Sequence, residues 1–214
     1  MTTGRKLLVV AFLAVACVIL AASLKGRHEN AKLDRLSRLR NQAERLNGAI
    51  TAGDVAGVKT LLAESGGDSA VFRVESYKGT TPLNCAVQSG RKEIVGLLMV
   101  NGAGVNVGDG FGLTPLHCAA GRGDKPMLEF LLSNGAKVNA KTIGGVTPLH
   151  MAVNSRQREA VELLVAKGAD INAKSITPEF AGPSLDDLYT PLQWAVKTGQ
   201  NEVADFLRKN GARD

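Results

Sequence analysis

The sequence has few aromatic residues and no recognisable catalytic motif. Aromatic side chains make up 4% of the 214 residues, with one Trp and two Tyr, which excludes a large core built around big rings. His, Cys and acidic residues do not recur at the spacing of zinc ligands, and no glycine-rich phosphate loop or nucleophile elbow is present. We therefore predict that the chain is not an enzyme and needs no metal or cofactor.

Excess charge of one sign is confined to the N-terminus. Residues 1–45 contain nine Lys or Arg and three acidic residues, whereas residues 46–214 contain 17 basic and 17 acidic residues. Binding to nucleic-acid phosphates depends on clustered basic side chains. The neutral body therefore argues against nucleic acid as a partner.

An apolar segment follows the first six residues. Residues 7–24 carry no charge, Pro or Gly, and as a helix they would span about 27 Å, just enough to cross a bilayer. We interpret residues 1–24 as a single-pass membrane anchor, and the basic residues after it favour a cytoplasmic body. A cleaved signal segment is the alternative, because Arg5 and Lys6 precede the apolar run, and cleavage would leave the body periplasmic or secreted. Lipidation of Cys17 is a third alternative.

Residues 25–45 are predicted to form a basic amphipathic connector helix. One face collects apolar residues at alternating steps of three and four, namely Leu36, Leu39, Ala43, Leu46 and Ile50. We expect this face to pack on the body while the basic face contacts anionic lipid head groups. The alternative is a short coiled coil through residues 36–50 that pairs two chains in a weak homodimer.

A repeated pattern occupies most of the remaining chain. Thr-Pro-Leu begins at Thr81, Thr114, Thr147 and Thr190, at steps of 33, 33 and 43 residues. A Leu-Leu or Phe-Leu pair follows each copy, and Asn-Gly-Ala or Lys-Gly-Ala ends it. A pattern this long indicates stacked supersecondary units, because one unit cannot bury its apolar face alone.

This pattern resembles the ankyrin-repeat family. The signatures Gly-x-Thr-Pro-Leu-His-x-Ala, Leu-Leu and Gly-Ala-Asp-Val-Asn are nearly complete in residues 76–174, and the predicted ankyrin-repeat domain covers residues 46–214. The resemblance implies an all-α solenoid of about five helix-turn-helix units with a concave groove. The first unit is degenerate, because residues 49–54 align with residues 86–90 but no Thr-Pro-Leu precedes them, as in a capping repeat.

Local chemistry favours two short helices in each unit. Thr and Pro begin the first helix as cap and first helical residue, and Gly90, Gly123 and Gly199 end it in a left-handed conformation. Asp124 is predicted to cap the second helix of its unit. Arg156 stands where the other copies have Gly, so we predict that this turn is either strained by about 1 kcal/mol or differently shaped.

The His, Cys and Trp residues of the repeats are interpreted as structural. His117 and His150 lie in Thr-Pro-Leu-His, where the resemblance implies a hydrogen bond between neighbouring turns. Cys85 and Cys118 occupy one position in adjacent units, too far apart for a disulfide, and are predicted to be buried free thiols. Trp194 occupies the equivalent position in its unit and is predicted to pack in the core.

The predicted partner-binding residues follow from the resemblance. Ankyrin proteins usually hold partners with the turn tips and with variable residues at the end of the first helix of each pair. These positions correspond here to Tyr77, Lys78, Phe111 and Ile143 at the tips, and to Gln88, Arg91, Arg122, Asp124, Ser155 and Gln157 at the helix ends. The alternative for Phe111 and Ile143 is that they pack on each other.

Ten extra residues precede the last Thr-Pro-Leu, within residues 175–188. Pro178, Gly182 and Pro183 predict an extended loop and not an added helix. We interpret this loop either as a projecting finger that presents Phe180 to a partner or as a neutral insertion, since longer loops cost little entropy.

These features together predict a membrane-tethered ankyrin-repeat module that binds another protein and acts as a scaffold or adaptor. The surface of a solenoid carries its function, so a protein partner is expected. The alternative is an exported binder or inhibitor, released after cleavage of the signal segment.

Overall fold

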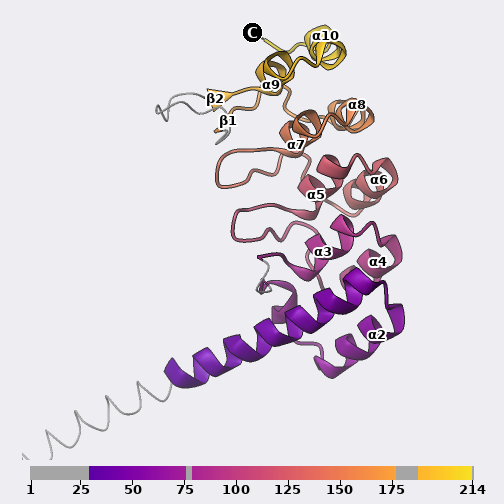
Figure 1. Ribbon diagram of the computed structural model, residues 1–214, viewed down its shortest axis with the longest axis vertical. Helices are drawn as coiled ribbons and strands as arrows, with labels where there is room; N and C mark the ends of the chain where they lie inside the picture. Colours follow the sequence, from indigo (N-terminus) through magenta and orange to yellow (C-terminus); the bar gives the residue numbers. More distant parts are fainter. Residues whose placement is uncertain (1–28, 76–78, 177–187, 214) are drawn as a thin grey trace, which may run out of the picture.

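Paired helices stack along one axis in the part of the chain that the structure describes, residues 29–75, 79–176 and 188–213 (Figure 1). The helix over residues 29–52, called the N-terminal helix below, pairs with α2 (Val55–Glu64), and a 3-10 helix, η1 (Ser69–Phe72), follows. The next pairs are α3 (Pro82–Gln88) with α4 (Lys92–Val100), α5 (Pro115–Arg122) with α6 (Lys125–Ser133), α7 (Pro148–Asn154) with α8 (Arg158–Ala166), and α9 (Pro191–Lys197) with α10 (Asn201–Lys209). This computed structural model confirms a mostly helical array of paired helices.

The first helix of each later pair begins where the sequence predicts. A Thr in extended conformation precedes α3, α5, α7 and α9, and Pro follows it in the first turn. Asp124 likewise caps α6, with its carboxylate accepting a hydrogen bond from the N–H of Met127. The side chains of Thr81, Thr147, Thr190 and Asp124 each accept from an N–H that the helix leaves without a partner, and such a cap stabilises a helix by about 1 kcal/mol.

Left-handed residues close the first helices. Gly90, Gly123 and Gly199 have φ of 68°, 68° and 69°, as predicted. Arg156 at the equivalent turn has φ of 57° and is the only described non-glycine residue with positive φ, which confirms the position predicted to be strained. Its guanidinium donates to the Thr198 carbonyl at 2.9 Å and so ties this turn to the next unit.

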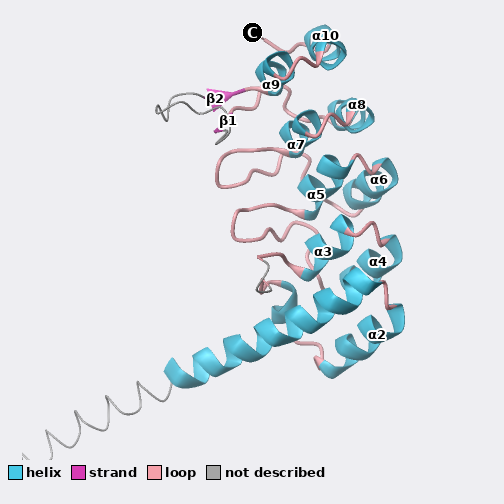
Figure 2. Ribbon diagram, viewed as in Figure 1, coloured by secondary structure: helices cyan, strands magenta, loops and turns pink. Residues whose placement is uncertain are grey.

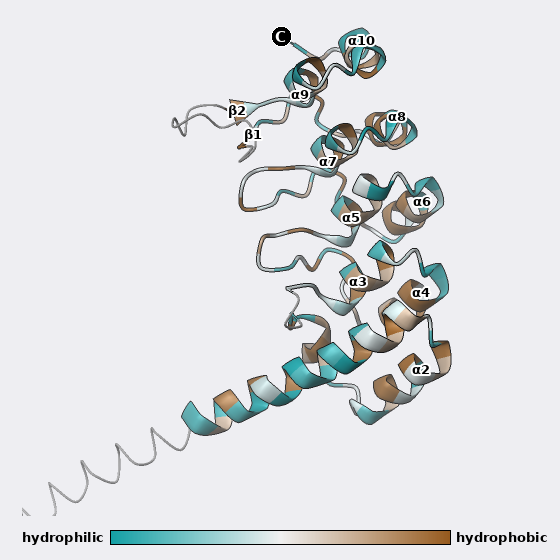
Figure 3. Ribbon diagram, viewed as in Figure 1, coloured by the Kyte–Doolittle hydropathy of each residue, from teal (hydrophilic) through white to brown (hydrophobic). Residues whose placement is uncertain are grey.

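One apolar core runs along the stack between the paired helices, which turn their hydrophobic faces toward each other (Figure 3). Two repeated positions are fully buried in it. One is an alanine in α3, α5, α7 and α9, and the other is a leucine in α4, α6, α8 and α10: Ala86, Ala119, Ala152, Ala195, Leu98, Leu131, Leu164 and Leu207. The small alanines let neighbouring units approach closely, and the leucines fill the space behind them.

Asparagine side chains link the outer ends of successive units. Asn139 donates to the Gly168 carbonyl at 3.3 Å and accepts from the N–H of Asp170 at 2.7 Å. Asn106 and Asn172 make the same pair of bonds to the units that follow them. These residues are the Asn of the repeated Val-Asn or Ile-Asn signature, whose role is therefore to join units.

The N-terminal helix is continuous, so the predicted boundary between connector and repeat domain at residue 45 falls inside it (Figure 2). Four residues of the predicted seam, Leu39, Ala43, Leu46 and Ile50, are buried in the common core. This contradicts the alternative of a homodimer through residues 36–50, because the chain itself covers the side chains that would form its interface. Leu36 remains 45% exposed, beyond the edge of the body.

The basic side chains of the connector are partly engaged by the body. Arg35 forms an ion pair with Asp68 at 3.3 Å, and Arg45 forms one with Glu64 at 3.2 Å. The apolar segment of residues 7–24 lies outside the described residues. Among the helices that are described, none is both long and apolar enough to cross a membrane.

The predicted all-α class needs one correction. β1 (Ser175–Ile176) and β2 (Leu188–Tyr189) form a short antiparallel ladder, with Ser175 opposite Tyr189. Residues 177–187 stand between these strands in the sequence and lie outside the described residues. Phe180, the residue predicted at the finger, lies outside the described residues, as do Tyr77 and Lys78.

Candidate functional site

Two turn tips project between successive helix pairs, and a side chain at the start of each holds it in shape. Asp109 accepts hydrogen bonds from the N–H groups of Phe111 and Leu113, both at 3.0 Å. In the next tip, Thr142 Oγ1 accepts from the N–H of Val146 at 3.0 Å. Both tips are closed by a backbone bond from their first residue to their fifth, at 3.1 Å and 3.0 Å. Each tip is therefore a rigid hairpin.

Neighbouring tips are bonded to each other. The N–H of Ile143 donates to the Phe111 carbonyl at 2.9 Å, and the N–H of Ile176 donates to the Gly144 carbonyl at 2.8 Å. The structure thus brings together Phe111 and Ile143, two of the predicted partner-binding residues. Their side chains remain 70% and 81% exposed, so contact between them leaves most of both surfaces open.

A hollow of about 610 Å³, called the tip groove below, lies beside these tips. Its lining is almost entirely apolar and consists of Gly110, Phe111, Leu113, Thr142, Ile143, Gly144, Val146, Met151 and Ile176. Thr142 is the one polar side chain in this lining, and its oxygen already accepts from Val146. An open apolar hollow of this kind is typical of a surface that binds an apolar segment.

Several predicted helix-end residues join one unit to the next. The Arg122 guanidinium donates to the Gln88 carbonyl of the preceding unit, and Gln88 Nε2 donates to Cys118 Sγ at 3.5 Å. Asp124 caps α6. These contacts give Gln88 and Arg122 structural roles that the sequence did not predict, and they confirm the cap predicted at Asp124.

Arg91 and Gln157 lie against the glycine turns of the preceding units. A Cβ on Gly53 would stand 2.7 Å from the Arg91 Cζ, and a Cβ on Gly123 would collide with the Gln157 amide. The glycines therefore leave room for these long side chains. Ser155 is half-buried at the end of α7.

One position in each first helix bonds to the turn of the next unit. Asn84 Nδ2 donates to the Leu113 carbonyl at 2.7 Å. In the degenerate first unit, Asn47 Nδ2 donates to the Thr80 carbonyl at 3.4 Å. In the next two units the ring Nε2 of His117 and His150 pairs with the carbonyls of Val146 and Tyr189 at 3.0 and 3.1 Å. These contacts confirm the bond between turns that the resemblance implies.

The buried environment keeps both histidines neutral. Desolvation lowers the pKa of His117, and it lowers the pKa of His150 from 6.5 to about 4. Each Nδ1 accepts from the N–H of its capping Thr, at 3.1 and 3.2 Å, so each Nε2 carries the proton. Both ring nitrogens are therefore occupied by structural bonds. Within the described residues, no group of three or more His, Cys, Asp or Glu could hold a metal ion.

The cysteines and tryptophan have the predicted structural roles. Cys85 and Cys118 are buried and free, and burial raises the pKa of Cys118 to about 11. Trp194 is 5% exposed and packs edge-on against His150, with ring centroids 5.3 Å apart. These residues belong to the core and not to a binding surface.

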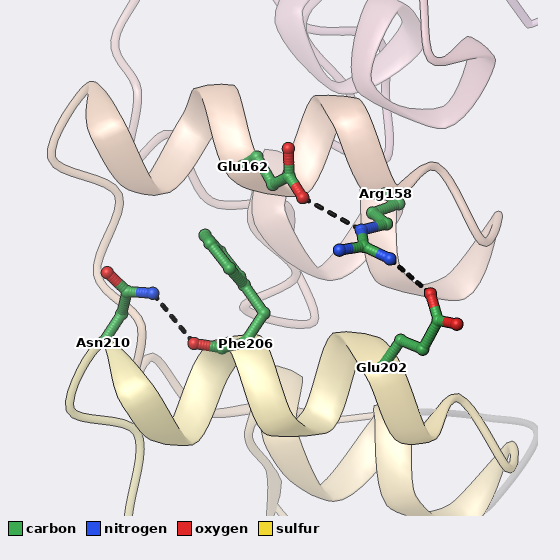
Figure 4. Close-up of polar contacts among 5 residues, drawn as sticks. All are labelled: Arg158, Glu162, Glu202, Phe206 and Asn210. Carbon is green, nitrogen blue, oxygen red and sulfur yellow. Dashed lines mark hydrogen bonds and ion pairs between the residues drawn. The ribbon is translucent and has the colours of Figure 1, made fainter.

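The outer row of helices carries exposed ion pairs. Arg158 contacts Glu162 of its own helix at 2.9 Å and Glu202 of α10 (Figure 4). In the same view Asn210 donates to the Phe206 carbonyl at 2.8 Å near the end of α10. Ion pairs this exposed stabilise a protein little. The pair of Arg158 with Glu202 joins α8 to α10, whereas the pair of Arg158 with Glu162 lies within α8.

The sequence analysis did not predict seven of the nine residues that line the tip groove, and four of these seven carry large apolar side chains: Leu113, Val146, Met151 and Ile176. A signal was available for two of them, because Leu113 and Val146 each stand directly before a Thr-Pro pair. Apolar residues at that repeated position lie between a tip and the helix that follows it. Met151 and Ile176 give no such signal, since they reach the groove only through the stacking of units.

Comparison with known proteins identifies the repeats. No curated protein matches the chain. Residues 93–175 match the family described as ankyrin repeats (3 copies), and residues 187–214 match the family described as ankyrin repeat. Repeats of this family are typically modules that bind other proteins without catalysis. Residues 93–214 of this chain therefore belong to the ankyrin-repeat family.

Proposed function

We propose that the chain binds another protein through the tip groove. The observation that carries this proposal is that Phe111 and Ile143 are bonded through their backbones while their side chains remain 70% and 81% exposed. Burying a large apolar side chain contributes roughly 1.5–3 kcal/mol, so two such anchors on one rigid surface are a substantial driving force. Membership of the ankyrin-repeat family supports the same conclusion.

The test is a pair of matched variants of the full-length chain. Ile143→Asp places a charge in the tip groove, and its exposed side chain makes the fold insensitive to the change. Val100→Asp places the same charge at the end of α4, where Val100 is 87% exposed outside the groove lining. Proteins cross-linked to each variant in the expressing cells are then quantified by mass spectrometry.

We expect at least one cross-linked protein to fall tenfold or more with Ile143→Asp and to be retained with Val100→Asp. Thermal unfolding should be the same for both variants. Equal recovery of every cross-linked protein by the two variants would refute the tip groove as the binding site. Arg122→Ala is a poor probe for this purpose, because it also removes the bond to the Gln88 carbonyl.

We further propose that residues 7–24 tether the module to a membrane, with the repeats in the cytoplasm and residues 25–45 near anionic lipid. Eighteen consecutive residues without charge, followed by a basic segment, support this topology. Protease protection of a C-terminally tagged chain in oriented vesicles, with mass analysis of the N-terminus, provides the test. An uncleaved chain with a cytoplasmic tag is expected, whereas cleavage at the end of the apolar segment and a tag outside would support the exported binder instead.

A further inference from the structure

We infer that the segment held by the tip groove is an amphipathic helix and not an added β-strand. This inference rests on the proposed function of the groove and concerns the kind of partner. A partner strand gains affinity by pairing its backbone N–H and C=O groups with a free edge of the receptor. A helix bonds its own N–H and C=O groups internally and needs only apolar side chains opposite it.

The tip groove offers almost no free backbone donor. All seven of its non-glycine lining residues donate their N–H groups within the chain. Phe111 and Leu113 donate to Asp109, Thr142 and Val146 to each other, Ile143 to Phe111, Met151 to Thr147 and Ile176 to Gly144. Only the N–H groups of Gly110 and Gly144 in this lining are without such a bond.

Several carbonyl groups around the groove also accept hydrogen bonds within the chain. Those of Phe111, Thr142 and Gly144 accept from the N–H groups of Ile143, Gly145 and Ile176 at 2.8–2.9 Å. Backbone groups that a partner strand would need are thus already paired between neighbouring units. A strand laid here would bury its own polar groups against apolar side chains, which is unfavourable unless those groups find partners.

The side chains complete the argument. Phe111 and Ile143 come from the two tips and Ile176 comes from β1, so the apolar surface continues from one unit to the next. A helix with apolar residues at positions i, i+3, i+4 and i+7 presents a continuous apolar ridge to such a surface. Its polar face remains in water, which suits a groove that is open on one side.

Two displayed peptide libraries of equal length and overall composition test the inference. One places apolar residues at i, i+3, i+4 and i+7 among strong helix formers, and the other alternates apolar and polar residues among β-branched ones. Both are selected against the full-length chain in lipid nanodiscs, after depletion on empty nanodiscs. Recovered peptides are compared on the wild type, Ile143→Asp and the control Val100→Asp.

We expect binders from the helical library whose affinity falls at least tenfold on Ile143→Asp and is unchanged on Val100→Asp. A central proline, which breaks a helix, should weaken them at least tenfold as well. Binders from the alternating library alone, or binders that tolerate the proline, would overturn the helix while leaving the groove as the binding site. A lack of Ile143-dependent binders in both libraries would overturn the proposed function itself.

Discussion

Mild acid should destabilise the stack through His150. The ring is fully buried, with Nδ1 accepting from the N–H of Thr147 and Nε2 donating to the Tyr189 carbonyl. A second proton would remove the acceptor and place a charge in the core. Desolvation therefore lowers the pKa of His150 from 6.5 to about 4, and the unfolded chain binds the proton more tightly than the folded one. Stability is lost as the pH falls from 6.5 to about 4.

The size of the effect follows from this shift. The whole shift corresponds to roughly 3 kcal/mol in the free energy of unfolding, of which roughly 2 kcal/mol is lost by about pH 5. Burial also lowers the pKa of His117, which adds to the loss. The pKa of Asp68 lies below 3.8, chiefly because its carboxylate accepts from the N–H of Ala70, so its titration falls outside this window.

Urea unfolding at neutral pH and near pH 5 measures the effect, with His150→Gln as the matched variant. Glutamine is a suitable replacement because Gln193 stands in α9 at the position that His150 has in α7. There the Gln193 Oε1 accepts a hydrogen bond from the N–H of Thr190 at 2.9 Å. Glutamine cannot take up the proton, so the variant should lose about 2 kcal/mol less than the wild type on acidification. If both proteins lose the same stability, the reasoning about His150 is refuted.

Three further predictions concern the stack. Gly199→Ala should lower the free energy of unfolding by roughly 1 kcal/mol, because Gly199 has a left-handed φ of 69°. Gly145→Ala should lower it more, because the added Cβ would also stand 3.0 Å from a backbone oxygen. Urea unfolding of both variants tests this order. Asn139→Ala removes two bonds between units and should cost roughly 1–2 kcal/mol, so an unchanged unfolding midpoint would contradict that role. Cys118 should resist iodoacetamide until the chain unfolds, since burial raises its pKa to about 11; mass spectrometry at increasing urea checks this.

The repeats were predictable because their chemistry is local and recurs. Thr-Pro at the helix start, Gly at the helix end and Leu at a fixed offset each act within a few residues, so the sequence displays them directly. Arg156 illustrates this well: its departure from the pattern was enough to locate a left-handed residue at φ 57°.

The roles of Arg91 and Arg122 could not be read in the same way. Both vary between units and are charged, which on the sequence alone is typical of a binding surface. In the fold they lie against the preceding unit, about one repeat away in the chain, with Arg122 bonded to the Gln88 carbonyl. Contacts across that separation depend on how units stack, and this geometry has no signal within a single repeat. For the same reason only Phe111 and Ile143 among the nine residues that line the tip groove were predicted.

The unbroken N-terminal helix has a mechanical consequence. Its last turns are part of the core of the stack, and the whole helix over residues 29–52 is about 36 Å long at 1.5 Å per residue. Because this helix is unbroken, a change in its direction at one end changes the orientation of the stack at the other end. Whatever fixes the tilt of this helix at residue 29 therefore also fixes the direction in which the turn tips face.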